Sequence, residues 1–198
     1  SQTTRVDKRD NRYEPKDGYV VSLTNELAGL SGDTQHFRTR IKTGYFVSLF
    51  EDKVLAFTAE SGHIIGIDQD VNIGERFFLG GQTVRGFSNS GIGPRDGITN
   101  DALGGNNYYA GSIELRFPLG LGEELGINGS LFTDVGSLWS LDRDSPDILD
   151  SSGARASAGF GLSWATGLGL MRVDFASALL KEDWDETEFV RFSFGTRF

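Results

Sequence analysis

The chemistry of this sequence centres on Arg85, which lies in a glycine-rich run at residues 80–87. This run belongs to a longer stretch, residues 65–106, that shows neither the two-residue period of a strand nor the period of a helix. A segment of that length without regular structure is usually disordered or functional. The stretch has apolar anchors of its own, which disordered segments lack: Phe77, Phe78, Val84 and Phe87. We therefore expect a long functional loop.

A guanidinium that folds inward with such a loop needs a carboxylate partner. Two acceptors, Glu114 and Asp134, fall on the polar phase of expected strands, and Gly86 would let the backbone beside Arg85 approach another surface closely. We expect a latch that fixes the loop inside a carboxylate-lined cavity. The latch would consist of Val84, Arg85, Gly86, Phe87, Glu114 and Asp134. A second interpretation stays open, in which both carboxylates pair with Arg116 and other arginines and only solvate the interior.

The segments that must position these residues alternate between apolar and polar side chains, which is typical of β-strands. Eight segments do so: residues 19–27, 37–49, 55–60, 109–117, 125–139, 155–164, 171–179 and 190–198. Their apolar faces hold no Asp, Glu, Lys or Arg. Their opposite faces hold charged residues separated by Gly, Ser and Thr: Arg38, Arg40, Lys42, Glu60, Glu114, Arg116, Asp134, Arg155, Arg172, Asp174, Arg191 and Arg197. Whether residues 1–8 form a further strand stays open, because their faces are not cleanly sorted.

Alternation alone does not say which face is inside, so a soluble lipocalin-like barrel remains an alternative. Three features favour a membrane barrel with a polar interior. The polar faces are rich in Gly and Ser, and short connections alternate with long ones, as they do between the two rims of outer-membrane barrels. Aromatic residues also lie near expected strand ends, as in an interfacial girdle: Tyr19, Tyr109, Trp139, Trp164 and Phe198. The sequence therefore predicts an all-β fold, an antiparallel transmembrane β-barrel with about eight strands in this chain.

The composition agrees with many short strands and restricts the function. The chain has 198 residues with 27 Gly, 15 Phe and 4 Pro, enough for one domain. A net charge of -9 argues against a nucleic-acid partner, and the absence of cysteine excludes disulfides and thiolate metal sites. No run approaches the apolar length of a transmembrane helix. Ser, His and Asp occur without a nucleophile-elbow context, and we expect no enzyme activity, no metal and no cofactor.

The loop motif resembles a known family. Val84-Arg85-Gly86-Phe87, preceded by Gly80-Gly81 and followed by Ile92-Gly93-Pro94-Arg95, resembles the sixth extracellular loop of the BamA-type outer-membrane protein assembly factors. Their superfamily includes mitochondrial sorting channels, chloroplast import channels and two-partner secretion translocators. The segments around Glu114 and Asp134 resemble the family's strands whose carboxylates hold the motif arginine. The resemblance covers residues 7–198 and implies the C-terminal half of a sixteen-stranded barrel, with residues 65–106 as an inward-folded extracellular loop.

The last residues carry a second resemblance. Residues 192–198 resemble the C-terminal signal by which outer-membrane barrels are recognised, with Phe192, Phe194, Gly195 and the final Phe198 as its members. Physically this is an edge strand, whose unpaired backbone groups can pair with another strand. In the family this strand meets the first strand in a weak seam that opens for client strands. Any membrane barrel ends in such a strand, so the signal alone does not separate an assembly factor from other barrels.

The resemblance implies a bacterial outer-membrane factor that folds and inserts β-barrel proteins without nucleotide or cofactor. Its expected partners are outer-membrane lipid and lipopolysaccharide, unfolded outer-membrane protein clients and, in the full-length protein, assembly-machinery lipoproteins, but no nucleic acid. The chain is expected to be a mature protein or a fragment, which would close on itself or self-associate with a second copy. Three alternatives stay open: a two-partner secretion translocator, a passive outer-membrane pore and, with less support, a soluble ligand-binding barrel.

Overall fold

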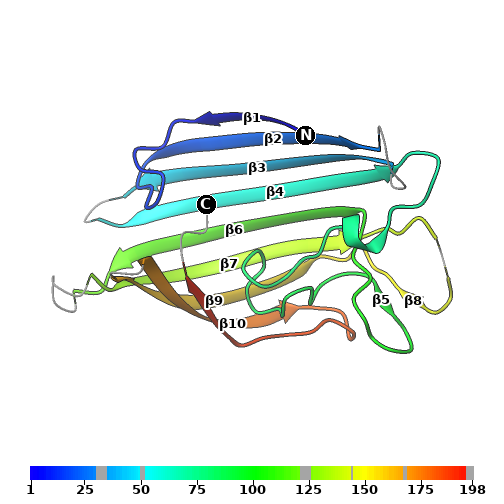
Figure 1. Ribbon diagram of the computed structural model, residues 1–198. Coiled ribbons are helices and arrows are strands. Elements are labelled where there is room, and N and C mark those ends of the chain that lie inside the picture. Colours follow the sequence, from blue (N-terminus) through cyan, green and yellow to red (C-terminus); the bar gives the residue numbers. More distant parts are fainter. Residues whose placement is uncertain (30–34, 50–51, 121–125, 144, 167–168, 195–198) are drawn as a thin grey trace.

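The computed structural model describes residues 1–29, 35–49, 52–120, 126–143, 145–166 and 169–194, and most of them belong to one curved antiparallel sheet (Figure 1). In spatial order its strands are β1 (Gln2–Asp7), β2 (Gly18–Ala28), β3 (His36–Ser48), β4 (Val54–Gly66), β6 (Asn107–Pro118), β7 (Asn128–Trp139), β9 (Arg155–Thr166), β10 (Gly169–Leu180) and β11 (Val190–Phe194). The loop after β4 contains a 3-10 turn, η1 (Ile73–Glu75), and strand β5 (Arg95–Asp96), which pairs with β8 (Ile148–Leu149). The expected all-β antiparallel fold is confirmed.

Each neighbour in the large sheet is also the next long strand along the chain, so the topology is a simple up-and-down meander. Its ends are β1 and β11, and the described residues therefore form an open, curved part of a barrel wall. The strands of the central region are 11 to 13 residues long. No helix in the described part of the chain is long and apolar enough to cross a bilayer.

The phase of the alternation is confirmed: apolar side chains face outward and charged ones face the concave side. Phe57, Ile113 and Phe192 are 37%, 48% and 69% exposed, whereas Glu114 and Asp134 are 3% and 1% exposed. A soluble lipocalin-like barrel needs the opposite arrangement. That alternative is therefore wrong.

In the described residues the large sheet has nine strands, where about eight were expected. The additional one is β1, which pairs with β2 from Gln2↔Asn25 to Asp7↔Val20 although its two faces are not sorted by polarity. Strand β4 also extends beyond residue 60, where the sequence pattern of apolar outward and polar inward side chains ends. In this last part the polar Ser61 and His63 face outward, and the apolar Ile64 is buried beneath the loop. The segment expected to begin at Leu125 is seen as β7 from Asn128, and Leu125 itself lies outside the described residues.

The lengths of the connections at the two rims agree only in part with the expectation. The two longest connections, residues 67–106 after β4 and 140–154 after β7, lie at the rim on the right in Figure 1. Residues 181–189 after β10 are, however, no longer a connection than residues 119–127 between β6 and β7 at the other rim. The longest connection, residues 67–106, folds back over the concave face of the sheet (Figure 1).

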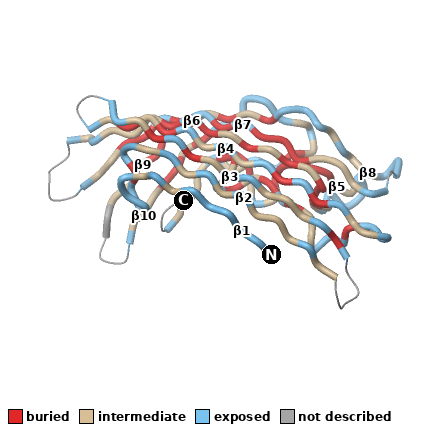
Figure 2. Tube along the Cα trace, turned by 90° about the horizontal axis from the view of Figure 1, so that it is seen from above, coloured by how far each residue is buried: buried red, intermediate tan, exposed pale blue. Residues whose placement is uncertain are grey.

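Part of the inner face beneath that loop is apolar, so the expected polar interior is found only outside this part. Loop side chains and inward side chains of β4, β6 and β7 form one buried cluster: Ile64, Val71, Phe77, Leu79, Val84, Phe87, Ile92, Tyr108, Ala110 and Leu138. Buried residues gather over these middle strands, while β1 is largely exposed (Figure 2). Of the four expected anchors Phe77, Val84 and Phe87 are buried, but Phe78 is 44% exposed and is not an anchor.

Candidate functional site

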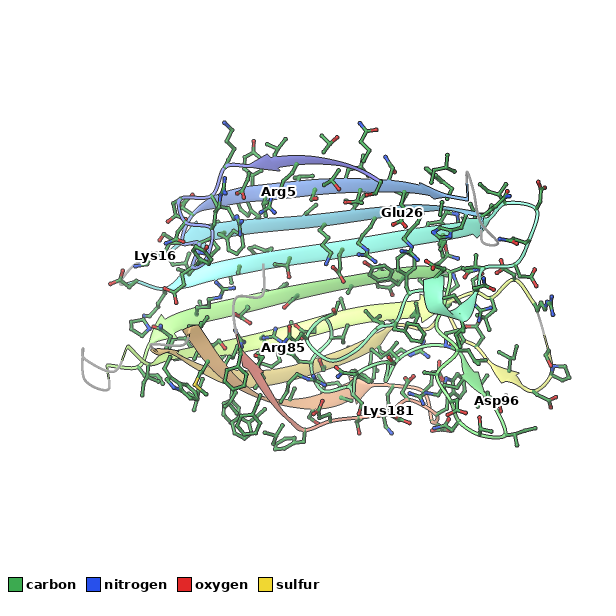
Figure 3. The ribbon with its side chains drawn as sticks, in the orientation of Figure 1. Arg5, Lys16, Glu26, Arg85, Asp96 and Lys181 are labelled. Atoms are coloured by element: carbon green, nitrogen blue, oxygen red, sulfur yellow. The ribbon has the colours of Figure 1, made fainter. Side chains whose placement is uncertain are left out.

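Arg85 is the largest fully buried side chain of the loop, and Figure 3 labels it where the loop meets the concave face of the sheet. Its Nε and Nη2 donate to Oδ2 and Oδ1 of Asp134, both at 2.7 Å, in the two-pronged geometry of an arginine–carboxylate pair. Its backbone N–H also donates to Asp134 Oδ2 at 3.0 Å, and its Nη1 donates to Glu114 Oε2 at 2.5 Å. The structure thus brings Arg85 to both carboxylates that the sequence singled out.

The strands place these acceptors by register. Glu114 and Ser112 lie on the inward phase of β6, Asp134 and Phe132 on that of β7, and the ladder sets Ser112 opposite Asp134 and Glu114 opposite Phe132. Ser112 Oγ donates to Asp134 Oδ1 at 2.6 Å and accepts from Arg85 Nη2 at 3.0 Å. The guanidinium carbon lies 3.2 Å from the centre of the Phe132 ring, a stacked cation–π contact. The guanidinium is therefore held both at its edge and on its face.

Three charged residues that were not assigned to the site complete the cluster. Arg172 Nη1 and Nη2 donate to Glu114 Oε1 and Oε2 at 3.0 and 2.8 Å, and its Nε donates to both oxygens of Asp174 at 2.8 and 2.9 Å. Arg116 Nε donates to Glu114 Oε1 at 2.7 Å. Glu114 therefore binds the loop arginine and two sheet arginines together, so the geometry contains both interpretations left open by the sequence.

The six charges of this cluster, which we call the latch cluster, balance: Arg85, Arg116 and Arg172 against Glu114, Asp134 and Asp174. Burial lowers the pKa of Arg85, but its hydrogen bonds and proximity to Asp134 outweigh burial and raise that pKa overall, so the guanidinium stays charged. Removing one partner from a buried ion pair typically costs about 3 to 5 kcal/mol, because the other charge is left unpaired.

Backbone close to Arg85 fits tightly against the sheet. Gly86 has φ of +89°, and a Cβ there would lie 3.1 Å from the Cβ of Ser157 and 3.4 Å from that of Ala176. Val84 and Phe87 on either side are fully buried in the apolar cluster. The loop thus docks through its backbone and apolar side chains as well as through Arg85.

A second set of contacts joins the loop to the connection between β10 and β11. The amide of Ser88 donates to Glu186 O at 3.0 Å, the amide of Glu186 donates to Gly91 O at 3.0 Å, and the amide of Glu188 donates to Gly86 O at 3.1 Å. These bonds form a short irregular ladder between residues 86–91 and 186–188. Nothing in the sequence pattern pointed to this contact, since neither segment alternates.

Two buried arginines secure the same region. Arg95 Nη1 donates to Glu186 Oε1 at 2.9 Å, and Arg155 Nε at the start of β9 donates to Asp185 Oδ2 at 2.9 Å. The side chains of Arg155 and Asp185 are both fully buried. Arg155 was assigned to the polar phase of its strand, but its partner lies in a connection whose position the sequence does not give.

The terminal strand β11 is an edge strand that pairs with β10 over five residue pairs, from Val190 to Phe194. Phe192 and Phe194 are 69% and 73% exposed on its outer face. Gly195 and Phe198 of the expected C-terminal signal lie outside the described residues. In the described ranges no group of three or more His, Cys, Asp or Glu side chains is arranged to hold a metal ion.

Comparison with known proteins gives consistent matches. A family model described as the Omp85 superfamily domain matches residues 1–198. The outer membrane protein assembly factor BamA of Neorickettsia risticii (strain Illinois) is 40% identical over 189 residues, which is 94% of this chain and 25% of that protein. The sorting and assembly machinery component 50 homolog of Xenopus tropicalis is 36% identical over 135 residues, 67% of this chain and 28% of that protein. This chain thus spans about a quarter of the length of these relatives.

A solved structure has the same fold. The crystal structure of BamA from Haemophilus ducreyi lacking POTRA domains 1–3 superposes with a TM-score of 0.87 at 22% sequence identity. The superposition covers 98% of this chain and 41% of that chain. The curved sheet is therefore similar to part of a BamA barrel.

Proposed function

This chain belongs to the Omp85 superfamily, and on that premise we propose that it is part of an outer-membrane protein assembly factor that folds and inserts β-barrel proteins into the outer membrane. The observation that carries the proposal is that one sheet has both an apolar outer face and, on its inner face, the buried latch cluster that holds the loop. Strands in a bilayer must satisfy their backbone groups within the sheet and turn apolar side chains to lipid. A sheet built in this way, with a loop fixed on its inner face, suits an insertion factor.

We place the protein in a bacterial outer membrane. The relative from Neorickettsia risticii is more similar and matches 94% of this chain, whereas the Xenopus tropicalis relative matches 67%. Its proposed partners are outer-membrane lipid and lipopolysaccharide on the apolar face, unfolded outer-membrane protein clients, and the lipoproteins of an assembly machinery.

Residues 1–198 would act as the C-terminal portion of the barrel, with residues 65–106 as an extracellular loop folded inward. The proposed role of Arg85, Glu114 and Asp134 is to latch this loop at one position. The contacts described above support that role, because the side chain of Arg85 hydrogen-bonds residues of two neighbouring strands, Glu114 on β6 and Asp134 on β7.

The proposed role of β11 is to present an edge to client strands. Its outer edge continues the sheet without a neighbour among the described strands, and backbone groups at such an edge can accept a further strand. The exposed Phe192 and Phe194 would lie against lipid at this edge.

The test uses the intact protein reconstituted in liposomes together with a urea-unfolded β-barrel client, whose folding is followed by its altered electrophoretic mobility. We expect the protein to accelerate client folding and Arg85→Ala to slow that acceleration by about ten-fold or more. Arg143→Ala is the matched control, because Arg143 is also a loop arginine with a carboxylate partner, Asp70, but its side chain is 85% exposed. Ion conductance without accelerated client folding would contradict the proposal and indicate a passive pore.

A further inference from the structure

Besides its pairing with Asp134, Arg85 places its Nη1 between two further carboxylates and hydrogen-bonds the nearer one, Glu114. Its Nη1 is 2.5 Å from Glu114 Oε2 on β6 and 3.7 Å from Asp174 Oδ1 on β10. Both carboxylates are almost completely buried, so water screens neither of the two negative charges. Another charged residue of the cluster must therefore determine which of these two carboxylates Arg85 binds.

Arg172 contacts both of these carboxylates. Its Nε binds both oxygens of Asp174, and its two terminal nitrogens bind both oxygens of Glu114. It therefore offsets the charge of Asp174, and at the same time its Nη2 donates to the same Glu114 Oε2 that accepts from Arg85 Nη1. Arg172 lies on β10, three strands from Glu114 on β6, and reaches it because the sheet curls.

The fold makes room for this arrangement at Gly161 on β9. A Cβ at this position would lie 2.4 Å from Asp174 Oδ1, 2.7 Å from Ser130 Oγ and 3.0 Å from Arg172 Nη2. Ser130 Oγ in turn accepts from Arg172 Nη2 at 3.1 Å. The pair of Arg172 and Asp174 thus occupies a space that a larger residue at position 161 would fill.

We propose that Arg172 is a positioning residue that selects the partner of Arg85: by pairing with Asp174 it keeps the loop on β6 and β7. Without Arg172 the buried cluster has one excess negative charge, and Arg85 Nη1 already lies 3.7 Å from Asp174 Oδ1. Arg85 then moves toward β10, the strand that carries the edge strand β11. This inference rests on the proposed function, in which the docked loop is needed for client folding.

The experiment compares Arg172→Met, Arg172→Met with Asp174→Asn, and Arg172→Lys in the intact protein. Two quantities are measured: the hydrogen-exchange rate of the Arg85 amide, which donates to Asp134, and the rate of client folding. We expect Arg172→Met to accelerate exchange and slow client folding, each by about ten-fold, and the double variant to recover most of both losses because it removes the pair as a unit. Arg172→Lys keeps the positive charge but loses the planar set of donors that binds two carboxylates at once, so we expect an intermediate result.

Recovery in the double variant separates positioning from a merely structural role. If Arg172 only filled space or stiffened β10, Asp174→Asn would add a second defect instead of a rescue, and the inference would be overturned. Unchanged exchange in Arg172→Met overturns it as well, as does a double variant that no longer folds.

The readouts also separate the inference from the proposed function. Defective client folding in Arg85→Ala together with normal exchange and folding rates in Arg172→Met refutes the inference alone. Altered exchange with recovery in the double variant, but normal client folding in every variant, supports the positioning role and refutes the need for the latch in assembly.

Discussion

The pairing of Arg85 with Asp134 predicts a large coupling energy between the two residues. Asp134 is 1% exposed and accepts three hydrogen bonds from Arg85, from Nε, Nη2 and the backbone amide. Arg85→Ala removes the two charged side-chain donors and leaves the buried carboxylate with neutral donors such as Ser112 Oγ and the backbone amide of residue 85. The loss should be about 3 to 5 kcal/mol of loop docking free energy, or about a hundred-fold or more in the docking equilibrium.

The amide of Ser88 reports that equilibrium, because it donates to Glu186 O only while the loop is docked. Its hydrogen-exchange rate is measured by mass spectrometry in Arg85→Ala, Asp134→Ala, the double variant and the unchanged protein. Each single substitution should accelerate exchange strongly, and the double variant should add little more, which corresponds to a coupling energy of about 2 kcal/mol or more. Additive effects, with a coupling below about 0.5 kcal/mol, would refute the reasoning.

Three further outcomes are expected. Gly86→Ala should weaken loop docking by about 1 to 2 kcal/mol, because φ is +89° and the new Cβ meets the sheet; unchanged protease sensitivity of the loop would contradict this. Arg155→Ala should accelerate exchange near Asp185 by about a hundred-fold or more, whereas exchange equal to that of the unchanged protein would show that their buried pair contributes nothing. Backbone N–H groups of Thr99 and Ile98 lower the pKa of Asp96, so this turn is stabilised above the ordinary aspartate pKa of about 4 and loses that contribution as pH falls through the lower folded value. A titration by NMR that gives Asp96 an ordinary pKa would contradict the last of these.

The sequence was sufficient for the strands and their facing because both follow from one local rule. Successive side chains alternate across a strand, so Phe57 and Ile113 reveal the outer face wherever the inner neighbours are polar. The rule fails at the end of β4, where the loop covers Ile64 and reverses the local polarity pattern. It also gave no decision for β1, whose register with β2 is set by backbone pairing.

The candidate site likewise contains residues that the sequence predicted and residues that it did not. Glu114 and Asp134 were found because they share the inward phase of neighbouring strands with a loop that needs an acceptor. Arg172 also faces inward, but its contact with Glu114 depends on how strongly the sheet curves across β7 and β9. The alternation of apolar and polar residues predicts which face a side chain is on, but it does not predict the curvature of the sheet. The contact between Arg155 and Asp185 was missed for a similar reason, since a connection without alternation gives no position in space.

The facing of the side chains is the claim on which the account depends, and lipid contact along β6 measures it directly. The chain has no cysteine, so spin labels at single introduced cysteines report one position each. In the membrane-embedded protein, labels at Ile113 and Leu115 should collide freely with oxygen dissolved in the lipid, and labels at Ser112 and Glu114 should not. Oxygen contact at the second pair and protection at the first would contradict the account.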